Sequence, residues 1–312
     1  MNILSLCSII LGVIIMLAMI IMYVLYKYIF LVPELKKHDD PYNLPKDDHI
    51  QIRKDQINAM LDRCMSLPCE DVWIKSHDGY KLHGRYFHTA DGAPVQILFH
   101  GYRSNAYRDF AGGLLLAVDS GCNVLLVDQR AHGESEGKCL SFGINERKDC
   151  RRWVDYIVSR FGADVKIILT GISMGAATVM MAAGPGIQKN VVGVISDCGY
   201  TSPKEILKEV ATSRGMSAKL YPLARWAGKI FGGFDVEEYS AIEAMKSCQV
   251  PMLFIHGDAD KFVPVEMGRE NFAACTADKT ILIVPGAAHG ISFMVDEAAY
   301  TEYVRKFLKK VC

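Results

Sequence analysis

The 312-residue sequence has no excess charge of either sign, because 35 Lys and Arg residues balance 35 Asp and Glu residues. A balanced chain lacks the basic surface that binds polyanions, so the composition argues against a nucleic-acid partner. The ten cysteines include no C-x-x-C pair, and the chain contains no N-x-S/T sequon. Several cysteines lie in apolar runs, where a free thiol behaves as a small hydrophobic side chain. These features favour a cytosolic rather than an extracellular protein.

Charge is also missing from the first part of the chain, since residues 3–26 contain no charged side chain. As a helix this run would extend about 36 Å, more than the roughly 30 Å hydrocarbon core of a bilayer. A cleaved signal peptide is the alternative. However, no basic residue precedes the run and no small-x-small cleavage site follows it. We therefore expect residues 1–30 to be a retained, single transmembrane anchor.

The residues after the apolar run predict its orientation. Tyr23, Tyr26 and Tyr28 cluster at its end, where an aromatic belt would lie. The nearby lysines, which include Lys27, Lys36 and Lys37, all follow the run. The positive-inside rule then places the body of the protein in the cytoplasm.

Residues 31–70 have the composition of a connector between the anchor and a larger unit. Their first half is polar and rich in proline, as in a linker. Their second half has helical spacing, with Ile52, Ile57, Met60 and Leu61 on one side. We expect a linker followed by a lead-in helix.

From residue 71 to 312, short apolar runs alternate with segments of helical spacing. This alternation predicts an α/β domain with a mostly parallel sheet and helices on both faces. Residues 71–88 read as a hairpin that would add antiparallel edge strands. Residues 199–247 interrupt the alternation and are expected to form a short helical cap.

One serine occupies an unusual position, in the stretch "ILTGISMGAATVM" at residues 168–180. Ser173 lies between a predicted strand and a predicted helix, with Gly171 and Gly175 two residues away on either side. A strand that turns at once into a helix needs small neighbours so that the two elements can approach. Such a turn lifts the hydroxyl above the carboxyl edge of the sheet, where sites form in this fold class. Chance occurrence of G-x-S-x-G in a glycine-rich protein is the alternative.

A serine hydroxyl becomes a good nucleophile only when a base removes its proton and a carboxylate orients that base. His289 follows the last predicted strand, and Asp258 and Asp260 follow the strand before it. Three other histidines also follow strand ends or nearby loops: His100, His132 and His256. The chain order of Ser173, the aspartates and His289 suits a catalytic triad on successive strand ends, with either aspartate as the acid.

Five segments together resemble the α/β-hydrolase family over residues 70–312: "LFHGYRSN", "VDQRAHGESEG", "GISMG", "HGDADKFVP" and "GAAHG". The resemblance implies a triad of Ser173, Asp260 and His289, since the family pattern G-x-x-D-x-x-V-P selects Asp260 over Asp258. It also implies an oxyanion hole made by the backbone N–H groups of Tyr102 and Met174. The family reaction is acyl transfer through an acyl-enzyme, which requires no cofactor.

The other polar residues of these segments have structural explanations. His100 is expected to support the oxyanion loop, and His256 to be a hydrogen-bonded structural histidine. His77 and His83 lie on the predicted hairpin and are expected to be solvated. The "DQRAHGES" loop is expected to be braced by its own polar side chains, Asp128, Arg130, His132 and Ser135. None of these residues has metal-ligand spacing, so no metal is expected.

The sequence thus predicts a membrane-anchored serine hydrolase of carboxylic esters, acting on a small acyl-ester or lipid-like substrate. A serine peptidase of the prolyl-peptidase kind and a non-catalytic scaffold on the same fold are the alternatives. Five apolar residues of the predicted cap could line an acyl pocket or could pack the cap onto the sheet: Leu220, Leu223, Trp226, Ile230 and Phe231.

Overall fold

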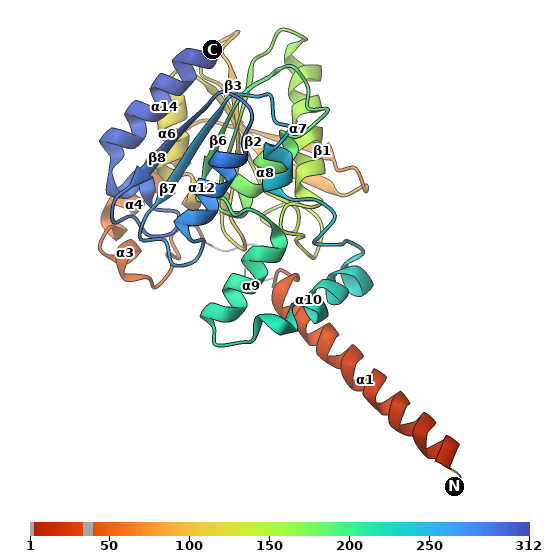
Figure 1. Ribbon diagram of the computed structural model, residues 1–312. Coiled ribbons are helices and arrows are strands. Elements are labelled where there is room, and N and C mark those ends of the chain that lie inside the picture. The colour runs from red at the N-terminus through yellow and green to blue at the C-terminus, as the bar shows by residue number, and fades with distance from the viewer. Residues whose placement is uncertain (1–2, 34–39) are drawn as a thin grey trace.

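A computed structural model describes residues 3–33 and 40–312 of the chain. Its centre is an eight-stranded sheet with the order β1-β2-β4-β3-β5-β6-β7-β8 (Figure 1). The strands are β1 (Glu70–Lys75), β2 (Lys81–Phe87), β3 (Val95–Phe99), β4 (Asn123–Val127), β5 (Ile167–Ile172), β6 (Val191–Asp197), β7 (Met252–Gly257) and β8 (Lys279–Val284). The strands β3 to β8 are parallel, whereas β2 is antiparallel to both β1 and β4. The predicted mostly parallel sheet with an antiparallel edge hairpin is confirmed.

Helices cover both faces of the sheet (Figure 1). One face carries α7 (Glu146–Phe161), α8 (Met174–Ala182), α11 (Ala241–Met245) and α12 (Val265–Ala274). The other face carries α6 (Ala111–Asp119) and α14 (Glu297–Val311), with the short helices α5 (Ala106–Asp109) and α13 (Ser292–Val295) beside them. Helices α5 and α6 are separated at Phe110, whose backbone (φ −110°, ψ 22°) leaves the helical conformation.

The central strands are apolar throughout because both of their faces are covered. Ile97 and Phe99 of β3 pack in the cluster with α7 and α8, whereas Leu98 packs in the cluster with α6. All three side chains are buried. This packing holds the carboxyl ends of the parallel strands rigidly along one edge of the sheet.

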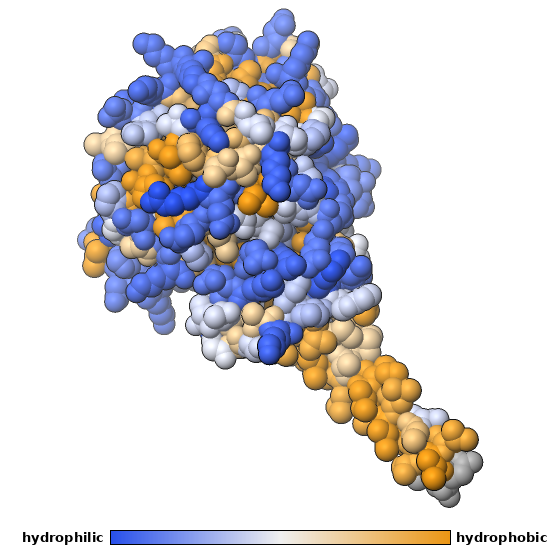
Figure 2. Space-filling view, viewed as in Figure 1, coloured by the Kyte–Doolittle hydropathy of each residue, from blue (hydrophilic) through white to orange (hydrophobic). Residues whose placement is uncertain are grey.

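The N-terminal helix α1 (Ile3–Ile29) projects from the body of the molecule (Figure 1). It is long and apolar enough to cross a membrane. Residues 3–21 are almost all exposed, and Figure 2 shows this part as a continuous hydrophobic rod. Its last turns differ, because Met22, Tyr26 and the following Phe30 are buried in the body. Lys36 and Lys37, two of the lysines behind the orientation prediction, lie outside the described residues.

The lead-in segment contains α3 (Asp48–Gln51) and α4 (Lys54–Ser66), which packs on α6. The helical spacing correctly predicted that Ile57 and Leu61 share the buried face of α4. The prediction was wrong for Ile52, which lies between the two helices and is exposed. A break after α3 removes this residue from the helical register.

Residues 199–247 contain several short helices between β6 and β7. They are α9 (Pro203–Ser213), the 3₁₀ helix η1 (Ala218–Leu220), α10 (Tyr221–Ala227), the π-helix η2 (Gly228–Gly232) and α11. Helices α9 and α10 lie at the base of α1 (Figure 1), and α10 and η2 contact α1 directly. We call the segment from α9 to η2 the cap. The cap therefore packs on the N-terminal helix as well as on the carboxyl edge of the sheet.

Candidate active site

Ser173 stands at the corner between β5 and α8, as the glycine pattern predicted. Its backbone has φ 56° and ψ −115°, a strained conformation for a residue with a side chain. The flanking glycines are needed because there is no room for a Cβ. A Cβ on Gly171 would lie 2.2 Å from the backbone of Gly175, and a Cβ on Gly175 would lie 1.8 Å from the carbonyl oxygen of Phe99. The close approach of helix to strand therefore fixes the serine in this position.

His289 and Asp260 lie in line with this serine. His289 Nε2 is 2.9 Å from Ser173 Oγ, and His289 Nδ1 is 2.7 Å from Asp260 Oδ2. These residues come from the loops after β8, β5 and β7, so the fold brings three strand ends together. Asp258 lies outside the chain of contacts, since its carboxylate accepts the Gly286 N–H at 2.6 Å. Of the two predicted aspartates, Asp260 is thus the one next to His289.

The surroundings of Asp260 keep its carboxylate ionised. Its side chain is fully buried, and burial alone would raise its pKa. Hydrogen bonds from His256 and His289, together with the Val263 N–H at 2.9 Å, outweigh burial and lower the pKa below its usual range. The Phe262 N–H also donates to this carboxylate, at 2.8 Å. A buried carboxylate of this kind can orient an imidazole and stabilise its protonated form.

The predicted oxyanion donors flank the serine. Met174 begins α8, where backbone N–H groups have no partner within the helix, and Tyr102 lies in the loop after β3. Neither N–H donates to another group among the described residues. The loop is held by Asp109, whose Oδ2 accepts the Gly101 N–H at 2.7 Å and whose Oδ1 accepts the Ser104 hydroxyl. Asp109 was not among the sequence-predicted residues.

A second buried carboxylate, Asp197, lies behind the serine and was also missed. It ends β6, its backbone oxygen accepts the Ser173 N–H at 2.9 Å, and it is 2% exposed. Burial raises the pKa of this carboxyl to about 6, although the charge of His256 and a hydrogen bond from Tyr300 act in the opposite direction. Its position at a strand end, directly after an apolar run, was the signal that could have identified it.

The remaining histidines have structural partners. His100 is fully buried, donates from Nδ1 to the Gly101 oxygen at 2.9 Å, and accepts the Gln129 N–H at Nε2. Burial lowers its pKa and keeps the ring neutral. His256 donates to the Val263 oxygen at 2.9 Å. Both contacts agree with the structural roles expected from the sequence.

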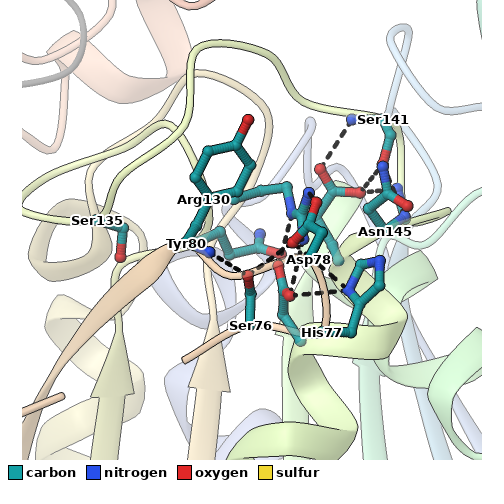
Figure 3. A network of polar contacts seen from close by, with 12 residues as sticks. Ser76, His77, Asp78, Tyr80, Arg130, Ser135, Ser141 and Asn145 are labelled. Carbon is teal, nitrogen blue, oxygen red and sulfur yellow. Dashed lines mark hydrogen bonds and ion pairs between the residues drawn. The ribbon is translucent and has the colours of Figure 1, made fainter. Parts of the chain in front are cut away.

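His83 corrects a sequence prediction, because it is 1% exposed rather than solvated. Strand β2 lies inside the sheet, so His83 is enclosed between Asp128 at 2.7 Å and Asp71 at 2.8 Å. Nearby, the Arg130 guanidinium binds Asp78 at 3.0 Å and Asp149 at 2.6 Å (Figure 3). These ion pairs fix the 128–137 loop against the hairpin and α7.

Two groups of side chains in the described residues have metal-ligand proximity. Cys198 joins Asp260 and His289, but burial raises the pKa of its thiol well above the usual value, which disfavours the thiolate that a metal requires. His77 joins Asp78 and Asp149, whose carboxylates already bind Arg130. A cation at the first group would have to displace the Cys198 thiol proton. A cation at the second group would have to displace the Arg130 guanidinium.

Two cavities meet at Ser173. The lead-in cavity, of about 290 Å³, also contacts His289 and extends towards Leu44, Ile57 and Arg108. The anchor cavity, of about 120 Å³, is bounded by α1 and the cap. Of the five cap residues proposed from sequence, only Leu220 lines it. Leu223 and Phe231 pack against the core instead, with the Phe231 ring against Tyr23 and Tyr26 of α1. Trp226 and Ile230 are about half exposed, so neither the pocket nor the packing interpretation describes these two residues.

Comparisons with known proteins agree with the fold described above. A sequence profile of the alpha/beta hydrolase family matches residues 96–305. The uncharacterized protein YqkD of Bacillus subtilis is 29% identical over 237 residues, which are 75% of this chain and 77% of YqkD. The Pyrococcus furiosus esterase Pf2001 has a TM-score of 0.64 at 24% identity, covering 80% of this chain and 95% of the esterase. Est1E of Butyrivibrio proteoclasticus, solved with ferulic acid, has a TM-score of 0.60 at 19% identity, covering 77% and 98%. With this fold and a profile match over more than half of its length, the chain belongs to the alpha/beta hydrolase family.

Proposed function

We propose that this hydrolase cleaves carboxylic esters through a triad of Ser173, His289 and Asp260. The observation that carries the proposal is the continuous hydrogen-bonded line from Asp260 through His289 to the hydroxyl of Ser173, a residue with a strained backbone. Binding alone would need neither a base within reach of a hydroxyl nor a buried carboxylate behind that base. The non-catalytic scaffold is therefore the weaker reading.

The geometry suits a two-step acyl transfer. In the first step His289 takes the proton of Ser173 as the serine oxygen forms a bond to the acyl carbon. The N–H groups of Tyr102 and Met174 stabilise the oxyanion, each by about 3 kcal/mol. Collapse breaks the bond to the leaving alkoxide, which receives the proton from His289. Water then attacks the acyl-enzyme and gives a proton to His289, and His289 passes that proton to the Ser173 oxygen as the bond to the acyl group breaks and the acid leaves.

An ester is favoured over a peptide by the cavities. A peptidase of the prolyl kind would need a carboxylate to bind the substrate amino terminus. The anchor cavity is lined by no Asp or Glu among the described residues. In the lead-in cavity, the Asp109 carboxylate already accepts a hydrogen bond from the Gly101 N–H, and Asp197 is buried, so neither is placed to bind an amino terminus.

The direct test is hydrolysis of chromogenic esters of increasing chain length, beside an aminoacyl amide. We expect the whole chain to cleave esters and Ser173→Ala to lose at least about a thousandfold in kcat/KM. Ser66→Ala is the matched control, because Ser66 lies exposed at the end of α4. Cleavage of the amide alone would establish a peptidase, and full ester activity in Ser173→Ala would refute the triad.

We further propose that α1 is a retained membrane anchor with the hydrolase on the cytoplasmic side. Removal of α1 as a signal peptide would strip Met22 and Tyr26 from the core, which supports retention. Cys69 and Cys312 are exposed on the hydrolase body, so their labelling reports on which side of the membrane the hydrolase lies. A membrane-impermeant maleimide should label them only after lysis of an expressing bacterial cell. Labelling in intact cells would show that the hydrolase lies on the opposite side of the membrane.

A further inference from the structure

The end of α1 forms one wall of a cavity that reaches the nucleophile. Leu25, Tyr28 and Ile29 of α1 line the anchor cavity together with residues of α9 and α10, and Ser173 lies at its inner end. Leu25 and Ile29 are half-buried and face inward, because positions four apart share one side of a helix. A segment that resembles a tether in the sequence is thus part of the substrate-binding surface.

The same end of α1 is bonded to the oxyanion loop. The Tyr102 hydroxyl donates to the Ile29 oxygen at 2.8 Å. The Arg103 guanidinium donates to the Tyr28 oxygen at 2.8 Å and to the Leu31 oxygen. Carbonyl groups at the end of a helix lack partners within it, and the helix dipole favours a cation there. These bonds fix α1 relative to the loop that carries the Tyr102 N–H.

The exposed length of α1 places the anchor cavity at a bilayer surface. Residues 3–21 would span about 28 Å as a helix, close to the roughly 30 Å hydrocarbon core. Burial against the body begins at Met22. The cap beside this point has exposed apolar side chains at Leu220, Trp226 and Ile230, each about half exposed. Lys229 lies over the Trp226 ring at 5.1 Å, a pairing suited to the headgroup region.

Ser173 lies between two mostly apolar cavities that differ in the polar side chains of their lining. On the side of α1 and the cap, the anchor cavity is lined almost wholly by apolar and aromatic side chains, with Arg214 near the Tyr28 hydroxyl at 2.5 Å. On the other side, the lead-in cavity is also lined mostly by apolar side chains, but it adds polar and charged groups, which include Ser104, Arg108 and Asp109. An amphipathic ester would fit across the serine with its apolar part towards α1 and its polar part away from it.

Given the proposed ester hydrolysis, on which this step rests, we infer that the physiological substrate is a fatty-acyl ester of a membrane lipid. Its acyl chain reaches Ser173 laterally from the bilayer along α1, so that the part of the chain next to the ester carbonyl lies in the anchor cavity between α1 and the cap and the rest extends towards the bilayer. Leu25 determines the preferred chain length, because it is the cavity-lining residue of α1 closest to the exposed span. A soluble short-chain ester would use only the part of the cavity next to Ser173.

The test compares two tryptophan substitutions one residue apart in the full-length protein. Leu25→Trp adds bulk on the cavity face of α1. Val24→Trp introduces the same side chain on the exposed face and is the matched control. Both proteins are reconstituted in dioleoylphosphatidylcholine vesicles and assayed on a p-nitrophenyl butyrate and on 1-oleoylglycerol carried in the vesicles. The readout is the ratio of kcat/KM for the oleoyl ester to that for the butyrate.

We expect Leu25→Trp to lower this ratio by about tenfold or more, since a filled cavity rejects the longer chain while shorter substrates still reach the serine. Val24→Trp should leave the ratio within about twofold of wild type. An unchanged ratio in Leu25→Trp, or wild-type cleavage of the butyrate without the oleoyl ester, would overturn the acyl route and leave the esterase proposal standing. Failure of wild type to cleave any ester would refute both.

Discussion

Phe30 provides the sharpest test of whether α1 is an integral part of the hydrolase or a tether attached to it. It directly follows α1 and is completely buried. Its ring meets that of Phe234 at 5.2 Å and that of Phe142 at 5.8 Å, both edge to face. Removing a buried phenylalanine ring typically costs about 3–5 kcal/mol of folding free energy, because packing is lost and a cavity remains. We expect a loss in this range for Phe30→Ala.

The assay is urea unfolding of the full-length protein in non-ionic detergent micelles, followed by tryptophan fluorescence, to which the buried Trp153 contributes. Val24→Ala is the control, because Val24 is 57% exposed in the same helix, and its substitution should cost less than about 0.5 kcal/mol. If Phe30→Ala cost under about 1 kcal/mol, the packing of the anchor end on the hydrolase would contribute little. The anchor cavity would then lack a fixed wall.

Three further predictions concern the active site. Asp260→Asn should reduce kcat by about a thousandfold or more, whereas Asp258→Asn should reduce it by less than about tenfold; equal losses in steady-state assays would remove the distinction between the two aspartates. Asp197 has a folded-state pKa of about 6, above its ordinary 3.8, so the stability it contributes below about pH 4 is lost as the pH rises through 6. Urea unfolding should therefore show wild type losing up to about 3 kcal/mol relative to Asp197→Asn between pH 4 and 7, and a constant difference would refute the raised pKa. Gly175→Ala should lower stability by roughly 2–4 kcal/mol in thermal unfolding, and a wild-type melting temperature would mean that α8 moves freely away from β3.

The parts of the fold and of the candidate site that depend on residues close together in the sequence were predictable. Gly171, Ser173 and Gly175 lie within five residues, and the strand on one side and helix on the other define the turn between them. Asp260 and His289 follow strand ends, and parallel strands bring their carboxyl ends to a common edge. Periodicity and the order of the strands along the chain therefore placed Ser173, the two aspartates and His289 at one edge of the sheet, whereas the choice of Asp260 over Asp258 came from the family resemblance.

Features that depend on contacts between distant segments were not predictable in this way. His83 was expected to be solvated because a hairpin strand resembles an edge, yet β2 lies between β1 and β4. Asp109 holds the oxyanion loop from α5, where an aspartate in a short polar helix has no distinctive pattern. The apolar run of α1 indicated membrane insertion, but its bonds to Tyr102 and Arg103 depend on two segments about 70 residues apart.

The measurement that tests the central claim most directly is covalent labelling of the full-length protein with a fluorophosphonate, followed by peptide mapping. The hydroxyl of a serine on a strained turn, 2.9 Å from an imidazole, should react where ordinary serines do not. We predict one adduct per chain, on Ser173, with ester hydrolysis falling in proportion to the labelled fraction and no adduct in Ser173→Ala. Ester hydrolysis that persists after complete labelling of Ser173, or an adduct on another residue that abolishes it, would contradict the proposed mechanism.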